Sequence, residues 1–342
     1  MKNIFKNKRV LVTGGTGSIG SAIVFELIKY GCKTIRVFSN DENGLHNLSM
    51  LLNNNENLNF IKSMKKNSIR YIYGDITDLN RIITATEDID YVIHAAAMKH
   101  VPICEYNPFE ATKVNVLGTE NVVRASLTHK NVKKFILIST DKVVDATTVL
   151  GSSKLLAEKN VLTTNLNKGS RKLNLSVVRF GNVIGTRGSV LPKFISQIQK
   201  NENITLTDKS STRFFVTVKE AVDCVISSMK MMKGGEIFIP KTIHSIKIYD
   251  LAISLKKFYP KSKSKINIIG LRDGEKVHEK IISLSEASKL KIYKNFYILD
   301  TLNKHKLKNL KMMFEYFESN KAKLLSQSKI ISYLKKNNLL DQ

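Results

Sequence analysis

One segment near the N-terminus limits the possible fold more than any other part of the sequence. Residues 8–13 (KRVLVT) form a short apolar run, and glycines follow at positions 14, 17 and 20. From Ser18 to Tyr30 apolar residues recur at helical spacing. A strand, a glycine turn and a helix N-terminus together favour a bound pyrophosphate. A tight turn without a ligand would use the same glycines, but the position in the first strand–helix unit favours nucleotide binding.

The following residues alternate between apolar strands and helical patterns. We expect strands at 34–38, 69–73, 91–94, 135–139 and 175–180, helices at 42–52, 79–86, 109–128 and 150–164, and a loop at 53–59. Buried strands joined by helices predict a parallel sheet covered on both faces, which is the doubly wound α/β fold, or Rossmann fold. The sequence therefore predicts an α/β protein.

The pattern loosens after residue 180, where glycines, shorter strands and further helices follow. We expect a dinucleotide-binding domain over 1–180, to which 211–243 returns. Residues 181–342 would form a smaller substrate-binding lobe that ends in basic C-terminal helices after Leu302.

Candidate cofactor residues follow the carboxyl ends of the first four strands, where such sheets bind ligands. Asp41 stands 21 positions after Gly20, near the spacing of an acid that binds a ribose hydroxyl, although an Asp there can equally cap the next helix. Small residues after the fourth strand leave room for a ligand. The candidates are Gly14, Thr16, Gly17, Ser18, Ile19, Gly20, Ser39, Asn40, Asp41, Asp75, Ile76, Ala95, Ala96 and Ala97.

The chain is strongly basic, with 55 Lys and Arg against 29 Asp and Glu, a net charge of +26. Such a charge can indicate a nucleic acid partner. However, Lys, Asn and Ile are abundant along the whole chain, as AT-rich codons would produce, and no nucleic-acid-binding motif accompanies them. We expect no nucleic acid partner, and an anionic small molecule would benefit from the same field.

The three cysteines, Cys32, Cys104 and Cys224, are far apart and lack neighbouring histidines, which indicates neither a disulfide framework nor a metal site. The first residues carry no apolar signal region, and no window approaches the length of a membrane span. We therefore expect a cytoplasmic protein without a membrane span.

Ten motifs occur along the chain in a fixed order. They are TGGTGSIG (13–20), GDITD (74–78), HAAAMKHVPICEYNP (94–108), KVNVLGTENV (113–122), ISTDK (138–142), GSSK (151–154), VVRFGNVIGTRGSVLP (177–192), ITLTDKSSTRFFVT (204–217), GGEIFIPK (234–241) and GLRDGEKVHE (270–279). Together they resemble the extended short-chain dehydrogenases that act as UDP-N-acetylglucosamine 4,6-dehydratases in capsule and flagellin-glycan synthesis. The C5-inverting enzymes are the most similar. The resemblance runs from about residue 8 to about 285.

The resemblance implies a lyase reaction with no net redox change. A tightly bound nicotinamide takes hydride from C4 of the sugar, the C4 ketone acidifies the C5 proton, water leaves from C6, and the hydride returns to C6. The product is a UDP-4-keto-6-deoxy-N-acetylhexosamine. In relatives the Asp of S-T-D-K is the acid and the Lys is the base, which correspond to Asp141 and Lys142. A lysine base needs a lowered pKa, from desolvation or from a nearby cation such as oxidised nicotinamide.

One departure from the family pattern concerns the proton on O4 of the sugar. Lys154 matches the Lys of Y-x-x-x-K, which binds the nicotinamide ribose, but the tyrosine position holds Leu150. Some dehydratases of this group carry methionine there. We hypothesise that Thr140, Asp141 or a water held by Lys154 accepts the O4 proton. Ala146 also replaces the usual proline in this loop.

The resemblance further implies NADP, the usual cofactor of the family, although relatives that use NADP tend to carry Arg where this chain has Asn40. The absent Arg, together with Asp41, leaves NAD possible. Lys99 is a candidate contact of both cofactor and substrate, and Lys154 a further cofactor contact. The other implied substrate contacts are Asn182, Arg187, Arg213 and Glu275, and a homo-oligomer is expected.

Two other functions remain open at this point. A nucleotide-sugar C4-epimerase uses the same ketone, although Asp141 and Lys142 argue for elimination. A relative that binds nucleotide without turnover is favoured only by Leu150.

Overall fold

The computed structural model describes residues 3–53, 68–241, 243–302, 304–305 and 317–340. Most of the loop expected at 53–59, and part of the region expected to hold C-terminal helices, lie outside these residues. In the described part of that region, one helix longer than a single turn follows Leu302, namely α13 (Gln327–Lys336).

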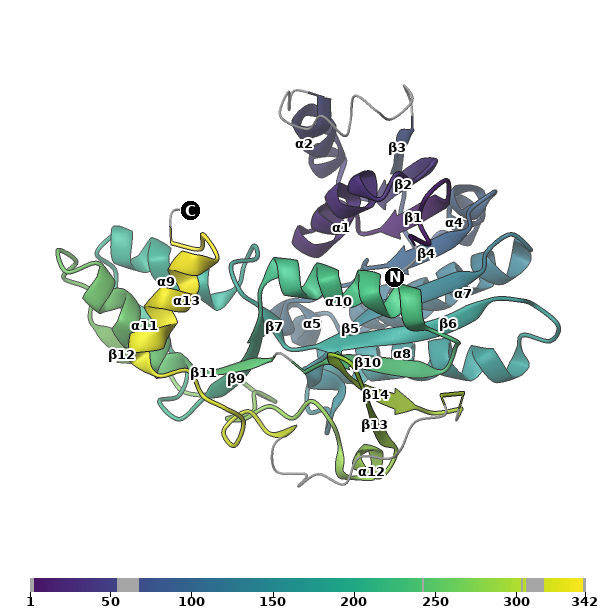
Figure 1. Cartoon of the computed structure of the whole chain (residues 1–342). Coiled ribbons are helices and arrows are strands. Elements are labelled where there is room, and N and C mark those ends of the chain that lie inside the picture. The colour runs from purple at the N-terminus through teal and green to yellow at the C-terminus, as the bar shows by residue number, and fades with distance from the viewer. Residues whose placement is uncertain (1–2, 54–67, 242, 303, 306–316, 341–342) are drawn as a thin grey trace.

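A nine-stranded sheet forms the centre of the molecule, in the order β13-β14-β10-β6-β5-β4-β1-β2-β3 (Figure 1). From β10 to β3 neighbouring strands are parallel, whereas β14 pairs antiparallel with both β10 and β13. The expected α/β fold with a doubly wound parallel sheet is therefore confirmed. The strands are β1 (Arg9–Thr13), β2 (Thr34–Ser39), β3 (Ile69–Tyr73), β4 (Tyr91–His94), β5 (Lys134–Thr140), β6 (Asn174–Phe180), β10 (Glu236–Pro240), β13 (Leu290–Tyr293) and β14 (Phe296–Asp300).

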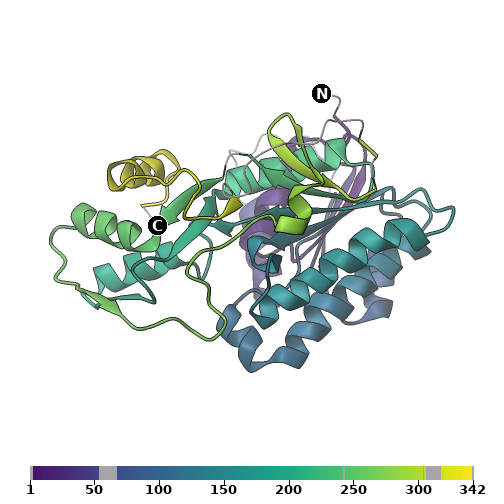
Figure 2. The same cartoon turned by 90° about the horizontal axis from the view of Figure 1, so that it is seen from below.

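Helices cover both faces of this sheet because successive strand residues point to opposite sides. In β1, Val10 and Val12 belong to one core cluster and Leu11 to the other. Helices α1 (Ser18–Lys29), α2 (Glu42–Asn53) and α10 (Val218–Met231) pack on the first face. Helices α4 (Leu79–Thr86), α7 (Thr119–Thr128) and α8 (Val149–Asn167) pack on the second, and Figure 2 shows α8 and its neighbours running along that face.

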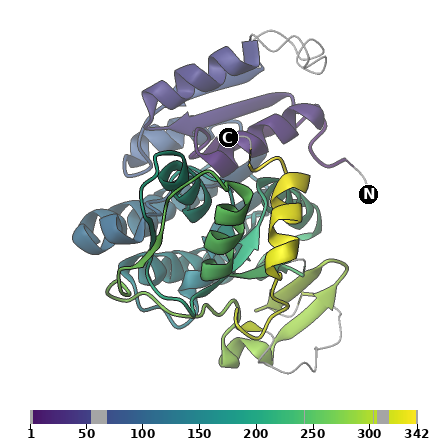
Figure 3. The ribbon, with the colours of Figure 1, turned by 90° about the vertical axis from the view of Figure 1, so that its left-hand side faces the viewer.

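A smaller lobe stands beside the sheet, on the left in Figure 1 and nearest the viewer in Figure 3. Helix α13 packs there beside α11 (Ile248–Phe258), over a third core cluster. Another helix of the lobe is α9 (Val190–Gln199). The strands of the lobe are β7 (Asn182–Val183), β8 (Ile204–Leu206), β9 (Thr212–Val216), β11 (His244–Lys247) and β12 (Ile266–Ile268).

The domain boundary at residue 180 stays a prediction. After this residue the chain contributes both to the lobe and to the large sheet. Within 211–243, β9 pairs with β7 and β11 in the lobe, whereas α10 packs on α1 and β10 joins the large sheet. Strands β13 and β14 also join this sheet as an antiparallel edge. The lobe therefore draws on several separate segments after residue 180.

The helix expected at 109–128 contains a π turn. The segment divides into α6 (Pro108–Thr112), the π-helical η1 (Lys113–Gly118) and α7. Inside the turn, the Asn115 Oδ1 accepts from the backbone N–H of Met98 at 2.9 Å, and its Nδ2 donates to the Ser153 Oγ at 3.0 Å. Such turns often occur at functional sites, and this one ties the segment after β4 to α8.

In the ranges that the structure describes, no helix has both the length and the apolar character that a bilayer crossing requires.

Candidate functional site

The glycine turn lies at the carboxyl end of β1, where the strand order reverses between β2 and β4. A Cβ at Gly14 would lie 2.7 Å from the Ala96 N, and one at Gly20 would lie 2.1 Å from the Gly14 O, so both positions need glycine for backbone packing. At Gly17 the nearest described atom to an added Cβ is the Gly14 O, at 3.2 Å, so a side chain there would be less crowded than at Gly14 or Gly20.

Helix α1 begins directly after this turn. Gly17 is its N-cap residue, so no side chain caps the helix, and no acidic residue lies in its first turn. Uncapped N–H groups and the positive end of the helix dipole suit an anionic group. The turn therefore fits the pyrophosphate of a dinucleotide.

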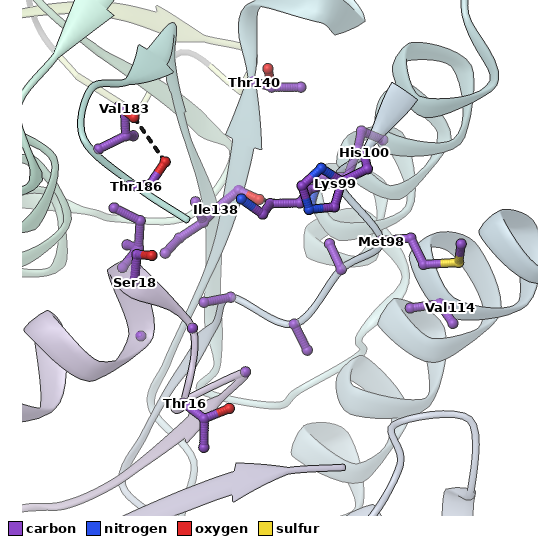
Figure 4. Close-up of a pocket in the computed structure, with 18 of the residues that line it drawn as sticks. Thr16, Ser18, Met98, Lys99, His100, Val114, Ile138, Thr140, Val183 and Thr186 are labelled. Atoms are coloured by element: carbon purple, nitrogen blue, oxygen red, sulfur yellow. Dashed lines mark hydrogen bonds between the residues drawn. The ribbon is translucent and has the colours of Figure 1, made fainter. Parts of the chain in front are cut away.

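A cavity of about 700 Å³ opens over the carboxyl ends of the parallel strands. In Figure 4, Thr16 and Ser18 lie on one side, Met98, Lys99 and His100 on the other, and Ile138 and Thr140 along the strand between them. The structure brings all sixteen expected cofactor residues to this cavity. They are Gly14, Thr16, Gly17, Ser18, Ile19, Gly20, Ser39, Asn40, Asp41, Asp75, Ile76, Ala95, Ala96, Ala97, Lys99 and Lys154. Their contact with a cofactor stays a prediction.

Polar side chains meet where β2 and β3 reach this cavity. The Asp41 Oδ1 accepts from the Gly44 N–H at 2.9 Å, which is the helix-capping role that we considered for it. The Asn40 Nδ2 donates to the Asp75 Oδ2 at 2.8 Å. Although burial raises the pKa of Asp75, hydrogen bonds from Thr77 and Asn40 bring it below its ordinary value. This end of the cavity therefore carries negative charge.

Thr140, Asp141 and Lys142 stand at the end of β5, in the short 3₁₀ helix η2 (Asp141–Val143) and directly before it. The Thr140 Oγ1 donates to the Asp141 Oδ1 at 3.0 Å. The Lys142 Nζ lies 3.1 Å from the same oxygen and donates to the Asn182 Oδ1 at 3.0 Å. It also lies 3.5 Å from the Glu279 Oε1. One lysine therefore meets two carboxylates and an amide.

Asp141 is fully buried, and its Oδ2 has no hydrogen-bond partner among the described residues. Thr140 and Lys142 line the large cavity, whereas the described lining does not include Asp141. In this structure Asp141 is therefore linked to the cavity indirectly, by its hydrogen bonds with Thr140 and Lys142.

The pKa values of this pair depart from the sequence-based expectation in one respect. Burial raises the pKa of Asp141, which suits an acid, and Lys142 offsets only part of this effect. Burial lowers the pKa of Lys142, but Asp141 and Glu279 together raise it above its ordinary value. The protein groups present thus hold Lys142 as a cation. The lowered pKa that a base needs is not found in this state.

Lys154 and Leu150 lie one turn apart on α8 and both line the large cavity. The Lys154 Nζ donates to the Ile138 carbonyl at 2.7 Å. Burial lowers the pKa of Lys154 to about 8, against the opposing charge of Glu158. Leu150 is 5% exposed and packs with Cys104 and Ala111, so an apolar side chain lines the cavity at the tyrosine position of the Y-x-x-x-K motif.

A second cavity of about 290 Å³ adjoins the first, and Lys142 lines both. Among the expected substrate residues, Lys99, Asn182, Arg213 and Glu275 line this second cavity. The described lining of the two cavities does not include Arg187.

Several of these candidates bind other protein groups. The Arg187 guanidinium donates to the Thr16 carbonyl at 2.9 Å, and its own carbonyl accepts from the Lys99 Nζ at 2.7 Å. The Arg213 Nη2 lies 3.0 Å from the Glu275 Oε1. Substrate binding by these residues stays a prediction.

Sequence reasoning missed Glu279, which lines the second cavity, and Asn115, which binds Met98 in the lining of the first cavity. Both lie inside motifs that we quoted, GLRDGEKVHE and KVNVLGTENV. The motifs were a signal, but position within a motif does not tell which carboxylate faces Lys142. Among the described residues, no group of three or more His, Cys, Asp or Glu side chains could hold a metal ion.

The fold and the glycine turn define the class, a Rossmann-type nucleotide-binding protein of the extended short-chain dehydrogenase type. Within it, residues 10–301 match the family described as polysaccharide biosynthesis protein, and the chain belongs to that family.

Individual relatives match over most of this chain. It is 43% identical to an uncharacterized membrane protein of Methanocaldococcus jannaschii, over 98% of this chain and 97% of that one. It is 40% identical to a UDP-N-acetylglucosamine 4,6-dehydratase (inverting) of Campylobacter jejuni (86% and 84%), and 39% to a UDP-glucose 4-epimerase of Rickettsia bellii (86% and 83%). The crystal structure of Pen from Bacillus thuringiensis is 36% identical, with a TM-score of 0.90 over 98% of this chain and all of that one.

Proposed function

We propose that this protein is a nucleotide-sugar 4,6-dehydratase, a lyase of surface-glycan synthesis. It would convert UDP-N-acetylglucosamine into UDP-4-keto-6-deoxy-N-acetylhexosamine with inversion at C5. One observation carries the proposal: Lys142 lines both cavities and lies 3.1 Å from a buried carboxyl group, that of Asp141. The similarity to the UDP-N-acetylglucosamine 4,6-dehydratase (inverting) of Campylobacter jejuni supports the same reaction.

The cofactor in this proposal is a nicotinamide dinucleotide held by the glycine turn and the ends of β2 to β4. When bound, it supplies a reversible hydride acceptor for C4 and C6 of the sugar. The family resemblance implies NADP, but we infer NAD. The residues that β2 and β3 contribute at the ribose end include Asp41 and Asp75, and the Asn40 amide is engaged by Asp75. Two carboxylates would repel a 2′-phosphate.

Proton transfer in this proposal uses the pairing at the end of β5. Thr140 lines the cavity and donates to Asp141, so a proton that leaves O4 can pass through the Thr140 hydroxyl to the Asp141 carboxylate. The raised pKa of Asp141 suits this uptake. Asp141 then gives the proton to the C6 hydroxyl, which leaves as water.

Protonation of Asp141 also prepares Lys142 for its role as base. A neutral Asp141 no longer stabilises the charged amine, so the pKa of Lys142 falls from its raised value and the amine can release its proton to solvent. The neutral amine of Lys142 then takes the proton from C5, which the neighbouring ketone has made acidic. In the last step C5 takes up a proton from solvent on the opposite face of the ring, which restores its hydrogen with inversion. Lys154, with a pKa of about 8, would bind the nicotinamide ribose, as the resemblance implies.

The second cavity would take the substrate's nucleotide part. Among its lining residues, Lys99, Lys193, Arg213 and Arg272 are cationic and would attract a diphosphate. Asn182 contacts Lys142 and stands where the two cavities meet, which suits a sugar contact. Glu275, which lines the same cavity, and Arg187, which contacts Thr16 and Lys99, complete the proposed set.

Assembly and location belong to the same proposal. Tyr106 at the end of α5 (Val101–Tyr106) and Phe109 in α6 are 87% and 82% exposed, and Leu117 in η1 and Leu156 and Leu166 in α8 are exposed too. These apolar side chains support a homo-oligomer. The three free cysteines support a reducing, cytoplasmic location.

The experiment incubates the purified protein with UDP-N-acetylglucosamine, without added cofactor, and follows the mass of the sugar nucleotide. We expect the loss of one water with no net consumption of the cofactor. The similarity to a UDP-glucose 4-epimerase favours a second candidate, C4 epimerisation. That reaction would leave the mass unchanged and alter the sugar. An unchanged sugar would indicate a protein that binds nucleotide without turnover.

A further inference from the structure

We propose that Glu279 is a positioning residue that holds the Lys142 amine at the junction of the two cavities and ties its protonation to that of Asp141. The geometry that points to this role is the ion pair between the Lys142 Nζ and the Glu279 Oε1, at 3.5 Å. The inference rests on the proposed dehydratase function for its catalytic consequence only.

The surroundings of Glu279 set it apart from a surface acid. Its side chain is 4% exposed, and its Oε2 has no hydrogen-bond partner among the described residues. Three cations face it, namely Lys142, Arg213 with its Nε at 3.9 Å, and Lys276. A buried carboxylate is tolerated only with such compensation.

The backbone of Glu279 is fixed by a segment distant in sequence. The Glu279 N–H donates to the Ser319 Oγ at 2.9 Å, and its carbonyl accepts from the Ser319 N–H at 2.8 Å. Ser319 is fully buried and also binds Thr212 of β9. Because the main chain is held on both sides, the carboxylate has a defined position opposite Lys142.

Further contacts tie the same segment, residues 274–280, to the loop that follows Lys142. The Lys276 Nζ donates to the Val144 carbonyl at 2.6 Å, and the Thr147 Oγ1 donates to the Gly274 carbonyl at 2.7 Å. Lys280 pairs with Asp145 at 2.9 Å. Segment 274–280 therefore restrains this loop at three places.

The charge of Glu279 acts on both members of the catalytic pair. Burial lowers the pKa of Lys142, whereas Asp141 and then Glu279 raise it, against the repulsion of Arg213. Burial is the main cause of the raised pKa of Asp141, and the charge of Lys142 lowers this pKa in part. The charge of Glu279 raises it further. Burial raises the pKa of Glu279 itself, but Lys142, Arg213 and Lys276 bring it below its ordinary value, so it stays ionised.

A constant charge at this place has a defined consequence. While Asp141 gains and loses its proton, Glu279 keeps the amine of Lys142 paired and in place. Without that charge the pKa of Lys142 falls, because one of its two anionic partners is gone. The pKa of Asp141 falls as well, because a like charge has been removed.

The test compares the parent with Glu279→Gln, which keeps the shape of the side chain. Asp145→Asn is the matched control, because it removes an exposed carboxylate that pairs with Lys280, the residue next to Glu279. Asn also tolerates the positive φ of 47° at position 145. An amine-reactive reagent labels lysines as a function of pH, and mass spectrometry of peptides follows Lys142. Thermal unfolding checks that both variants are folded.

We expect the labelling midpoint of Lys142 to move to lower pH in Glu279→Gln and to stay in place in Asp145→Asn. An unchanged midpoint in a folded Glu279→Gln protein would overturn the proposal, and so would an equal shift in both variants. If Glu279→Gln does not fold, Glu279→Asp, which keeps the charge but shortens the reach, replaces it, and a smaller downward shift is expected.

The labelling readout needs no turnover, so it judges Glu279 even if the parent does not dehydrate the sugar. Where the parent is active, both limbs of the pH–rate profile should move to lower pH in Glu279→Gln. The maximal rate should fall about tenfold, a part of the ~10²–10⁴ that positioned acid–base groups supply. An inactive parent would contradict the proposed dehydratase function. An unchanged pH–rate profile in an active Glu279→Gln variant would contradict the proposed role of Glu279.

Discussion

Leu150 lies one helical turn before Lys154 on α8, and the two side chains line the same cavity. An apolar wall therefore stands beside an amine whose pKa is lowered to about 8. No phenol is available at this position to accept the proton from O4, so the hydroxyl of Thr140 has to begin the proton route in our proposal.

Replacing Leu150 by Tyr tests that route. We expect less than a tenfold change in kcat, because Thr140 and Asp141 already provide a path and because a larger side chain is forced against Cys104. Leu150→Met, which stays apolar, should retain the parent rate. A nearly inert parent that gains turnover greatly from the tyrosine would instead identify a decayed catalyst.

Asp141→Asn and Lys142→Met should each lower kcat by ~10²–10⁴, the usual contribution of a positioned acid or base. The measurement is product formation by mass spectrometry, with nucleotide content as the control, since neither residue lies in the glycine turn. If the double variant dehydrates the sugar as fast as the parent, the assignment of acid and base is wrong.

The lowered pKa of Lys154 makes the stability of the protein depend on pH. Between pH 8 and pH 10.5 the unfolded chain keeps a proton on this lysine that the native chain has lost, so the free energy of unfolding rises with pH there. The rise amounts to ~3 kcal/mol for a lysine displaced this far. We expect Lys154→Met to lack this rise when urea unfolding is followed over the same range. Parallel curves for parent and variant would contradict the assignment.

Two glycines of the turn should respond differently to alanine. A Cβ at Gly20 meets the Gly14 O at 2.1 Å, so Gly20→Ala should lower stability by ~1–3 kcal/mol. At Gly17 the Cβ contact is 3.2 Å, which a small shift can relieve, so Gly17→Ala should lose less stability than Gly20→Ala but bind the dinucleotide more weakly, by about tenfold or more. Calorimetry of unfolding and of cofactor binding separates the two effects. Equal stability losses would refute the distinction.

Asn40→Arg tests the choice of cofactor. A guanidinium at this exposed position can bind a 2′-phosphate bidentately and neutralise Asp75 nearby. We expect the parent to release NAD on denaturation and the variant to prefer NADP by about tenfold or more. Mass spectrometry of the released nucleotide gives the answer, and NADP from the parent would correct our inference.

Much of the fold could be predicted because local patterns and packing agree. The expected strand at 69–73 and helix at 79–86 coincide with β3 and α4, since period and burial point to the same elements. The π turn around Asn115 could not be predicted from periodicity. It depends on side-chain bonds to Met98 and Ser153, which lie elsewhere in the chain.

The same contrast holds for the site. Residues next to strand ends, such as Thr140 and Lys142, could be placed in the cavity because the carboxyl ends of parallel strands share one edge of the sheet. The contact of Arg187 with the Thr16 carbonyl spans 171 positions in the chain, so spacing does not encode it, and substrate binding by Arg187 stays a prediction.

By itself, the sequence determined the glycine turn and the parallel sheet, because both follow from strand and helix patterns that are local in the chain, and its motifs suggested Asp141 and Lys142 as the reacting pair. The tertiary structure decided which charges surround that pair. Glu279 reaches Lys142 because Ser319 fixes its backbone and because segment 274–280 contacts the loop that follows Lys142. A pKa depends on distances in space between charged groups, and local patterns in a chain do not contain those distances.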